Sequence, residues 1–258
     1  MLPGRTAALT SALVALVTLA APGASRADAP PESAAASVVP DALLLGLAQH
    51  AARFEDMKRR GAFTMTGRIE ELDGSGHVSE ANEIALRSTP TPAPMDRITN
   101  VIRYLENGKD KTAEAQKRAN ERRAKRLKDP GEQAEARKKD LRLPFLASEQ
   151  PRYVFTLAER DPTQGRVRIA FVPKTPAENA LKGSAWVDEN AREVLSAGFS
   201  LSKNPTFVDH VEITIVFGLP TPLGRAPSKI SFEGRGGFLF IHKHFRGEAT
   251  ISEPLVAF

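Results

Sequence analysis

The sequence contains no cysteine. Disulfide bonds and thiolate metal sites are therefore excluded, and so is the lipid-bearing cysteine that follows the signal sequence of a bacterial lipoprotein. A chain without covalent cross-links must be stabilised by its hydrophobic core. Its 258 residues are enough for one such core.

Common catalytic motifs are absent as well. The chain carries neither a GxSxG nor an HExxH pattern. Neighbouring carboxylates such as Glu70 and Glu71 point to opposite faces of a strand and cannot act together. The stretch Glu233–Gly237 is rich in glycine but lacks the lysine and the helix of a phosphate loop, so it is interpreted as a turn. We predict that the protein is not an enzyme, with no catalytic residues and no cofactor. An envelope hydrolase is the less favoured alternative.

Histidines offer the best candidates for a metal site. His242 and His244 lie two residues apart in a predicted strand, so they share one face, and His210 lies in another predicted strand. Two such histidines can begin a metal site, but the sequence places no carboxylate or third ligand beside them. We predict no metal site and interpret these histidines as polar residues of a strand surface.

The only long apolar run lies at the N-terminus. One cation, Arg5, precedes an apolar stretch over residues 7–21, and Ser25-Arg26-Ala27 offers a cleavage site. This is the layout of a secretory signal peptide, and the run is shorter than the roughly 20 residues of a membrane-spanning helix. We predict a cleaved signal peptide over 1–27 and a periplasmic protein; an uncleaved anchor and release outside the cell are the alternatives. Residues 28–40, rich in proline, alanine and serine, are predicted to be a flexible lead-in.

The basic residues are concentrated in one segment. Residues 106–142 hold thirteen lysines and arginines and eight acidic residues, which accounts for the whole net charge of +5. Acid-to-base pairs four residues apart, such as Glu114 with Arg118, favour a helix in this segment. Asp129-Pro130-Gly131 is expected to break that helix into two. Because acids alternate with the cations and the segment holds no aromatic residue, we predict no nucleic-acid binding. We interpret this insert as a solvated helical excursion. Contact with a membrane surface or an acidic partner is the alternative.

A single amphipathic helix is predicted over 41–60. Asp41 is expected to cap its N-terminus, and Gly61 is expected to end it. Its apolar stripe needs a partner, and the dry face of a sheet is the obvious one. The stripe consists of Leu44, Leu47, Ala48, Ala51, Phe54 and Met57.

The rest of the chain has the period of two that is typical of strands. Asp73–Gly76 and Asp161–Gly165 are hairpin turn signals. We predict an α+β fold that is mainly antiparallel β. It is a curved open half-barrel meander of about 8–10 strands, with the N-terminal amphipathic helix on its concave side and the charged helical insert at about 107–142, all in one domain over 41–258. The predicted strands are 62–72, 77–87, 96–106, 151–159, 166–173, 183–188, 193–203, 208–218, 227–234 and 236–251.

Two stretches resemble a known family. LKGSAWVDENAREVLSAGFSLSK (181–203) resembles the strand and turn of LolA-like outer-membrane lipoprotein-sorting proteins, with Gly183, Trp186, Val187 and Asp188 at the motif positions. YLENGKDKTAEAQKRANERRAKRLK (104–128) is similar to a subgroup with a charged helical insert. The family, which includes LolB and RseB, implies a curved antiparallel half-barrel, helices in its concavity and an apolar cavity for acyl chains. The insert departs from LolA, and the missing cysteine departs from LolB.

This resemblance directs attention to the apolar side chains of the helix and strands. It implies a periplasmic binding protein or carrier that holds a lipid, a lipoprotein or another apolar ligand without covalent chemistry. An envelope sensing or protein-interaction module in the manner of RseB is the alternative. The candidate ligand-contact residues, each of which could also simply fill the core, are Leu47, Phe54, Phe155, Phe171, Trp186, Phe199, Phe217, Phe238 and Phe240.

Overall fold

The computed structural model describes residues 37–93, 96–128, 143–238 and 241–256. The predicted signal peptide and most of the lead-in lie outside these ranges, as does the insert beyond residue 128. The lead-in prediction is wrong at its C-terminal end. There Ser37–Val38 form the short strand β1, and Val39 is buried in the core beside Leu43. An apolar valine next to the helix start packs instead of staying in solvent.

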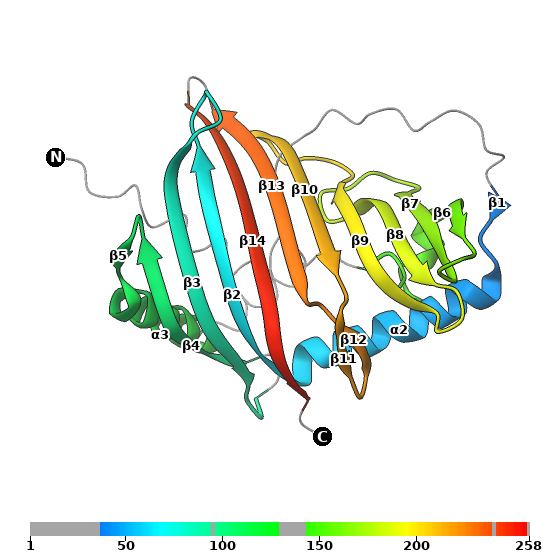
Figure 1. Ribbon diagram of the computed structural model, residues 1–258, viewed down its shortest axis with the longest axis horizontal. Coiled ribbons are helices and arrows are strands. Elements are labelled where there is room, and N and C mark those ends of the chain that lie inside the picture. The colour runs from blue at the N-terminus through cyan, green and yellow to red at the C-terminus, as the bar shows by residue number, and fades with distance from the viewer. Residues whose placement is uncertain (1–36, 94–95, 129–142, 239–240, 257–258) are drawn as a thin grey trace.

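The described chain forms one open antiparallel sheet (Figure 1). Its order is β1-β6-β7-β8-β9-β10-β13-β14-β2-β3-β4-β5, and the two-residue strands β1 and β5 (Lys109–Asp110) stand at its edges. The predicted open, mainly antiparallel half-barrel is confirmed. The long strands are β2 (Gly61–Leu72), β3 (Val78–Pro90), β4 (Arg97–Glu106), β6 (Tyr153–Asp161), β7 (Arg166–Pro173), β8 (Leu181–Asp188), β9 (Glu193–Leu201), β10 (Val208–Val216), β13 (Lys229–Phe238) and β14 (Ile241–Val256).

The two faces of the sheet differ because side chains alternate along each strand. On β7, Val167 and Ile169 are fully buried, whereas Arg168 between them is partly exposed. We call the face on which the helices pack the inner face and the opposite one the outer face. The inner face is apolar and the outer face is polar, as the alternation predicted.

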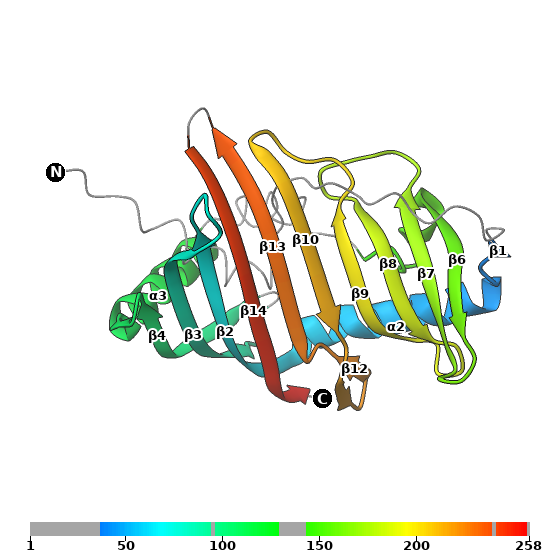
Figure 2. The same ribbon diagram turned by 45° about the horizontal axis from the view of Figure 1, so that its top comes forward.

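Helix α2 (Asp41–Arg60) crosses the inner face beneath β7 to β10 (Figures 1 and 2). Its stripe packs there: Leu44 and Phe54 are partly buried, the other four residues are buried, and Leu47 is completely inaccessible. The N-cap residue is Pro40, so the prediction that Asp41 caps the helix is wrong. Asp41 is the first helical residue and makes no capping hydrogen bond, but its negative charge interacts favourably with the helix dipole. The helix ends at Arg60 as predicted. Gly61 then leads directly into β2, and a Cβ atom there would lie 2.6 Å from the carbonyl oxygen of Met57.

The core has two parts. One lies between α2 and strands β6 to β9, and the other lies between β2, β3, β4, β13 and β14. Ile213 and Ile215 of β10 pack against both, so the apolar surface runs without a break along the inner face.

The first half of the charged insert is helix α3 (Thr112–Lys128), and it packs on the sheet. Ala115 is buried against β4, and the Gln116 side chain accepts a hydrogen bond from the Val101 amide at 2.6 Å and donates one to the Thr99 carbonyl at 3.1 Å. The interpretation as a solvated excursion is therefore wrong for this half. Alanines supply its buried side, and Gln116 satisfies the backbone groups of an edge strand.

A short hairpin, β11 (Leu219–Thr221) and β12 (Gly224–Ala226), lies against α2 between β10 and β13. The stretch Glu233–Gly237 is not a turn, because β13 continues through it to Phe238. Gly236 passes so close to the residue before β10 that a Cβ atom would lie 2.6 Å from the Phe207 carbonyl oxygen. Within the described ranges, no helix has the length and apolarity that crossing a membrane requires.

Candidate functional site

An apolar pocket lies on the inner face between α2, residues 143–145 and strands β7 to β10. Its enclosed volume is about 40 Å³. No charged side chain contributes to its wall among the described residues, and the wall is almost entirely carbon. The lining residues are His50, Ala51, Phe54, Leu143, Pro144, Phe145, Phe171, Leu181, Val194, Ala197, Phe199, Ile215 and Phe217.

Aromatic rings hold the walls of this pocket together. Phe54 of α2 meets Phe217 edge to face, with ring centroids 5.5 Å apart. On the other side, Phe145 stacks on Phe155 at 5.5 Å and meets Phe171 edge to face at 5.7 Å. Each such pair contributes roughly 0.5–1.5 kcal/mol beyond the burial of its area. The helix and residues 143–145 are thus attached to the sheet mainly by side-chain packing.

His50 is the one polar side chain in the pocket wall. Its Nδ1 accepts a hydrogen bond from the Val194 amide at 3.4 Å, so Nε2 carries the proton. Nε2 is buried, and no hydrogen-bond partner for it exists in the part of the chain that the structure describes. Burial lowers the pKa of His50, against the opposing effect of Glu193. The imidazole is therefore neutral at physiological pH, and the pocket carries no charge.

Four of the predicted ligand-contact residues meet in this pocket: Phe54, Phe171, Phe199 and Phe217. Leu47 lies in the same core cluster but is fully covered. Phe155 packs beside the pocket through Phe145 and is half-buried.

Trp186 does not belong to this group, and its assignment to the cavity is wrong. It alternates with the buried residues Ala185 and Val187 and so lies on the outer face. There the Arg166 guanidinium lies 4.5 Å from its ring centroid and that of Arg168 lies 5.8 Å away. The Phe238 side chain and the whole of Phe240 lie outside the described residues.

Sequence reasoning missed the segment Leu143-Pro144-Phe145 and His50. Pro144 and Phe145 are buried. The signal for this segment was available, since five apolar residues, 143–147, directly follow the charged insert before polar residues resume at Ser148. His50 carried no such signal, because its burial depends on the packing of α2 against β9.

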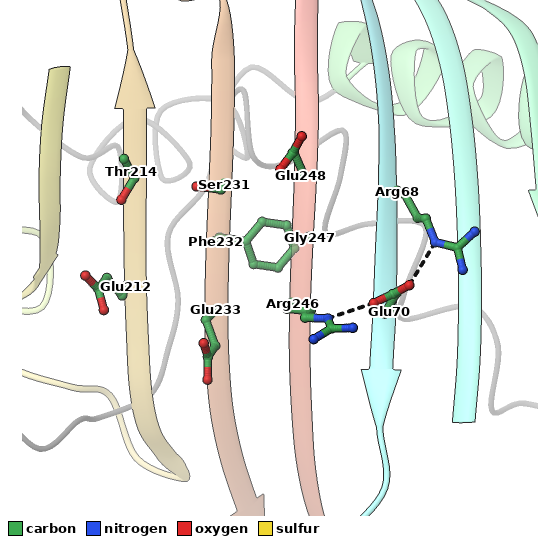
Figure 3. A pocket seen from close by; sticks show the side chains of 10 residues that line it. All are labelled: Arg68, Glu70, Glu212, Thr214, Ser231, Phe232, Glu233, Arg246, Gly247 and Glu248. Atoms are coloured by element: carbon green, nitrogen blue, oxygen red, sulfur yellow. Dashed lines mark hydrogen bonds and ion pairs between the residues drawn. The ribbon is translucent and has the colours of Figure 1, made fainter. Parts of the chain in front are cut away.

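A second depression, a polar groove of about 450 Å³, lies on the outer face over β10, β13, β14 and β2 (Figure 3). Ion pairs cross it: Glu70 accepts hydrogen bonds from Arg246 at 2.7 Å and from Arg68 at 2.9 Å. These two hydrogen bonds lower the pKa of Glu70. The groove is wide and solvated, and its charges are largely paired with one another. Its lining mixes these charged groups with the ring of Phe232 and lacks the continuous carbon wall of the inner pocket, so we assign the candidate site to the inner pocket.

The three histidines weighed as metal ligands do not form a cluster. The Nε2 atom of His244 lies 2.8 Å from the Glu233 carboxylate, and His210 lies near Glu212 at 3.9 Å. Across the described ranges, no group of three potential ligands is close enough to hold a metal ion.

Comparison with known proteins gives structural neighbours only. No family model and no curated protein matches the chain. A LolA superfamily protein from Nitrosomonas europaea matches with a TM-score of 0.35 and 10% identity, over 86% of this chain and 94% of that one. A DUF1329 family protein from Desulfovibrio piger matches with a TM-score of 0.36 and 9% identity, over 83% and 92%. MucB in the MucA/MucB complex of Pseudomonas aeruginosa matches with a TM-score of 0.21 and 10% identity, over 80% and 94%.

These neighbours include the family that the sequence around Trp186 resembles. Likeness at this level carries no argument about what the present chain binds. The functional proposal therefore rests on the side chains of the inner face.

Proposed function

We propose that the protein is an exported, periplasmic binding protein or carrier that holds the acyl part of a lipid or lipoprotein on its inner face. The observation that carries the proposal is the composition of the pocket wall, which is carbon except for one neutral histidine. Binding would be non-covalent. Each methylene that leaves water for such a site contributes about 0.8 kcal/mol. The location rests on the signal-like N-terminus.

The pocket must open to receive a chain. Its 40 Å³ equal only a few water-sized volumes of about 10–15 Å³ each. The part of the wall that we expect to move is residues 143–146, which contact the sheet through Phe145 and Leu146. The Gln150 amide holds this segment to the helix by donating to the carbonyls of Leu44 at 2.8 Å and Phe145 at 3.0 Å. Displacement of this segment would expose Phe54, Phe171 and Phe199 to a ligand.

Two matched substitutions test the proposal. Ala197 lines the pocket from β9, whereas Ala170 is its counterpart on the outer face of β7. We expect Ala197→Phe to fill the pocket and abolish uptake of a fluorescent fatty acid such as cis-parinaric acid, and Ala170→Phe to bind it like the unmodified protein. Thermal unfolding of both variants checks that they are folded, and Ala197→Leu replaces the first if it is not. Equal binding by all proteins would refute the pocket as the site.

A second candidate function, an envelope sensing or protein-interaction module, is favoured by one observation. Strand β6 pairs with β1 only at Thr156 and Leu157, so most of its outer edge has no strand beside it within the described ranges. An edge of this kind can accept a strand from another protein. A tagged protein recovered from the periplasm with a stoichiometric protein partner and no lipid would support this function over transport.

A further inference from the structure

Helix α3 presents arginines to the inner face. Ala115 and Ala119 pack against the core of β2 to β4, and Arg118 lies on the same side of the helix. The Arg118 guanidinium lies over the Tyr104 ring of β4, 6.0 Å from its centroid. Arg122 follows one helical turn later, which places a second guanidinium next to the first.

Two donors of Arg118 are buried and unused. Its Nε and Nη2 atoms are shielded from solvent, and neither has a hydrogen-bond partner in the part of the chain that the structure covers. These two nitrogens lie on one edge of the guanidinium and donate in parallel. This edge matches two oxygens of a carboxylate or phosphate. Leaving both donors buried without a partner is unfavourable, and an anion in this position would remove the penalty.

The acidic residues of the helix are paired with other cations. Glu114 pairs with Lys111 at 2.6 Å, and Glu121 lies 4.0 Å from Lys117. Burial lowers the pKa of Arg122, and the neighbouring charge of Arg118 adds to this effect. The guanidinium of Arg118 therefore lies close to a second cation on this side of the helix.

We infer that Arg118 binds the anionic head group of an amphiphilic ligand whose acyl chain lies along the inner face. The inference rests on the proposed function and extends it by naming the ligand class, an anionic single- or multi-chain lipid. The apolar core is continuous from Tyr104, through Ile84 and Met65, to Ile213 and Ile215 beside the pocket, and an acyl chain would enter it by displacing the groups that now cover these residues. Five inter-strand steps of about 4.8 Å separate β4 from β10, or roughly 24 Å. A long acyl chain, rather than a short one, would extend from the arginine to the pocket.

The test uses two probes that differ only in a phosphate, 1-palmitoyl lysophosphatidic acid and 1-palmitoylglycerol, with inorganic phosphate as a third. Affinities are measured by calorimetry on the full-length exported protein after removal of bound lipid. Arg118→Gln removes the head-group contact. Lys117→Gln removes the same charge from the neighbouring position, where the side chain is 78% exposed and turned away from the sheet. Arg118→Lys keeps the charge without the paired donors and serves if the glutamine variant does not fold.

We expect the unmodified protein and Lys117→Gln to bind the phosphate-bearing probe at least about tenfold more tightly than the neutral one. Arg118→Gln should reduce this ratio to near one, and Arg118→Lys should retain only part of it. Equal affinities for the two lipids in the unmodified protein would overturn the head-group site while leaving the proposed function intact. No binding of either lipid would overturn the proposed function itself. Tight, Arg118-dependent binding of inorganic phosphate alone would show an ion site and refute the head-group assignment. An affinity ratio that falls as far in Lys117→Gln as in Arg118→Gln would refute it as well.

Discussion

Phe217 connects the fold to the proposed ligand site. It is 6% exposed at the end of β10, and its ring meets Phe54 at 5.5 Å and His50 at 6.2 Å. Its amide donates to the Leu195 carbonyl at 2.8 Å, which fixes the backbone independently of the ring. Replacing it by alanine should therefore remove the packing without moving the strand. Loss of a buried phenylalanine ring costs about 3–5 kcal/mol.

The same substitution should enlarge the pocket by the volume of the ring. Because ligand methylenes can then occupy that space, we expect Phe217→Ala to bind palmitate more tightly than the unmodified protein does. Bound ligand should also restore stability: at a free concentration of 100 Kd it contributes about 2.7 kcal/mol, which offsets most of the loss.

Denaturant unfolding with and without palmitate measures both effects. Leu72→Ala is the matched control, since Leu72 is 8% exposed at the end of β2 but belongs to neither core cluster and lies away from the pocket. It should lose about 2–5 kcal/mol, and its affinity for palmitate should not change. If palmitate bound all three proteins equally, or stabilised Leu72→Ala alone, the pocket would not be the binding site.

Three further predictions follow from single residues. Burial lowers the pKa of His50 below its ordinary 6.5, so the unfolded chain takes up a proton below that pH and the folded protein does not. Stability should thus fall as pH drops from about 7.5 to 5.5, and the fall should be smaller in His50→Phe, as denaturation midpoints at the two pH values would show. Gly183→Ala should lower the free energy of unfolding by at least about 2 kcal/mol, since the new Cβ atom would lie 2.1 Å from the Gly198 carbonyl oxygen. Gly74→Ala is the control: no atom lies within 4 Å of its Cβ position, so the denaturation midpoint should change little. Trp186→Phe should leave palmitate affinity unchanged, because Trp186 lies on the outer face; a loss of affinity would contradict that placement.

Much of the fold could be predicted because the apolar periods are strong. The three- and four-residue spacing around Leu47 predicted α2, and alternation around Ile169 predicted both the strand and its buried face. The same rule, applied strictly, would have placed Trp186 correctly. It stands between Ala185 and Val187 and shares its side of the strand with Ser184 and Asp188, so its face was available from the sequence.

Other features depend on contacts that a local pattern does not encode. The docking of α3 rests on Ala115 and on Gln116, whose side chain bonds to β4, and neither residue marks a buried helix by composition. The His50 environment likewise arises only when β9 comes next to α2. The pocket therefore needed the structure, although four of its phenylalanines were predicted.

The central claim is that the inner face holds an acyl ligand. Native mass spectrometry of the protein purified from the periplasm, followed by organic extraction, tests it most directly. We expect a bound species of lipid or acylated-peptide mass that is recovered in the extract and is absent from Ala197→Phe. A ligand-free mass for the unmodified protein, with no uptake of added phospholipid or acyl peptide, would contradict it.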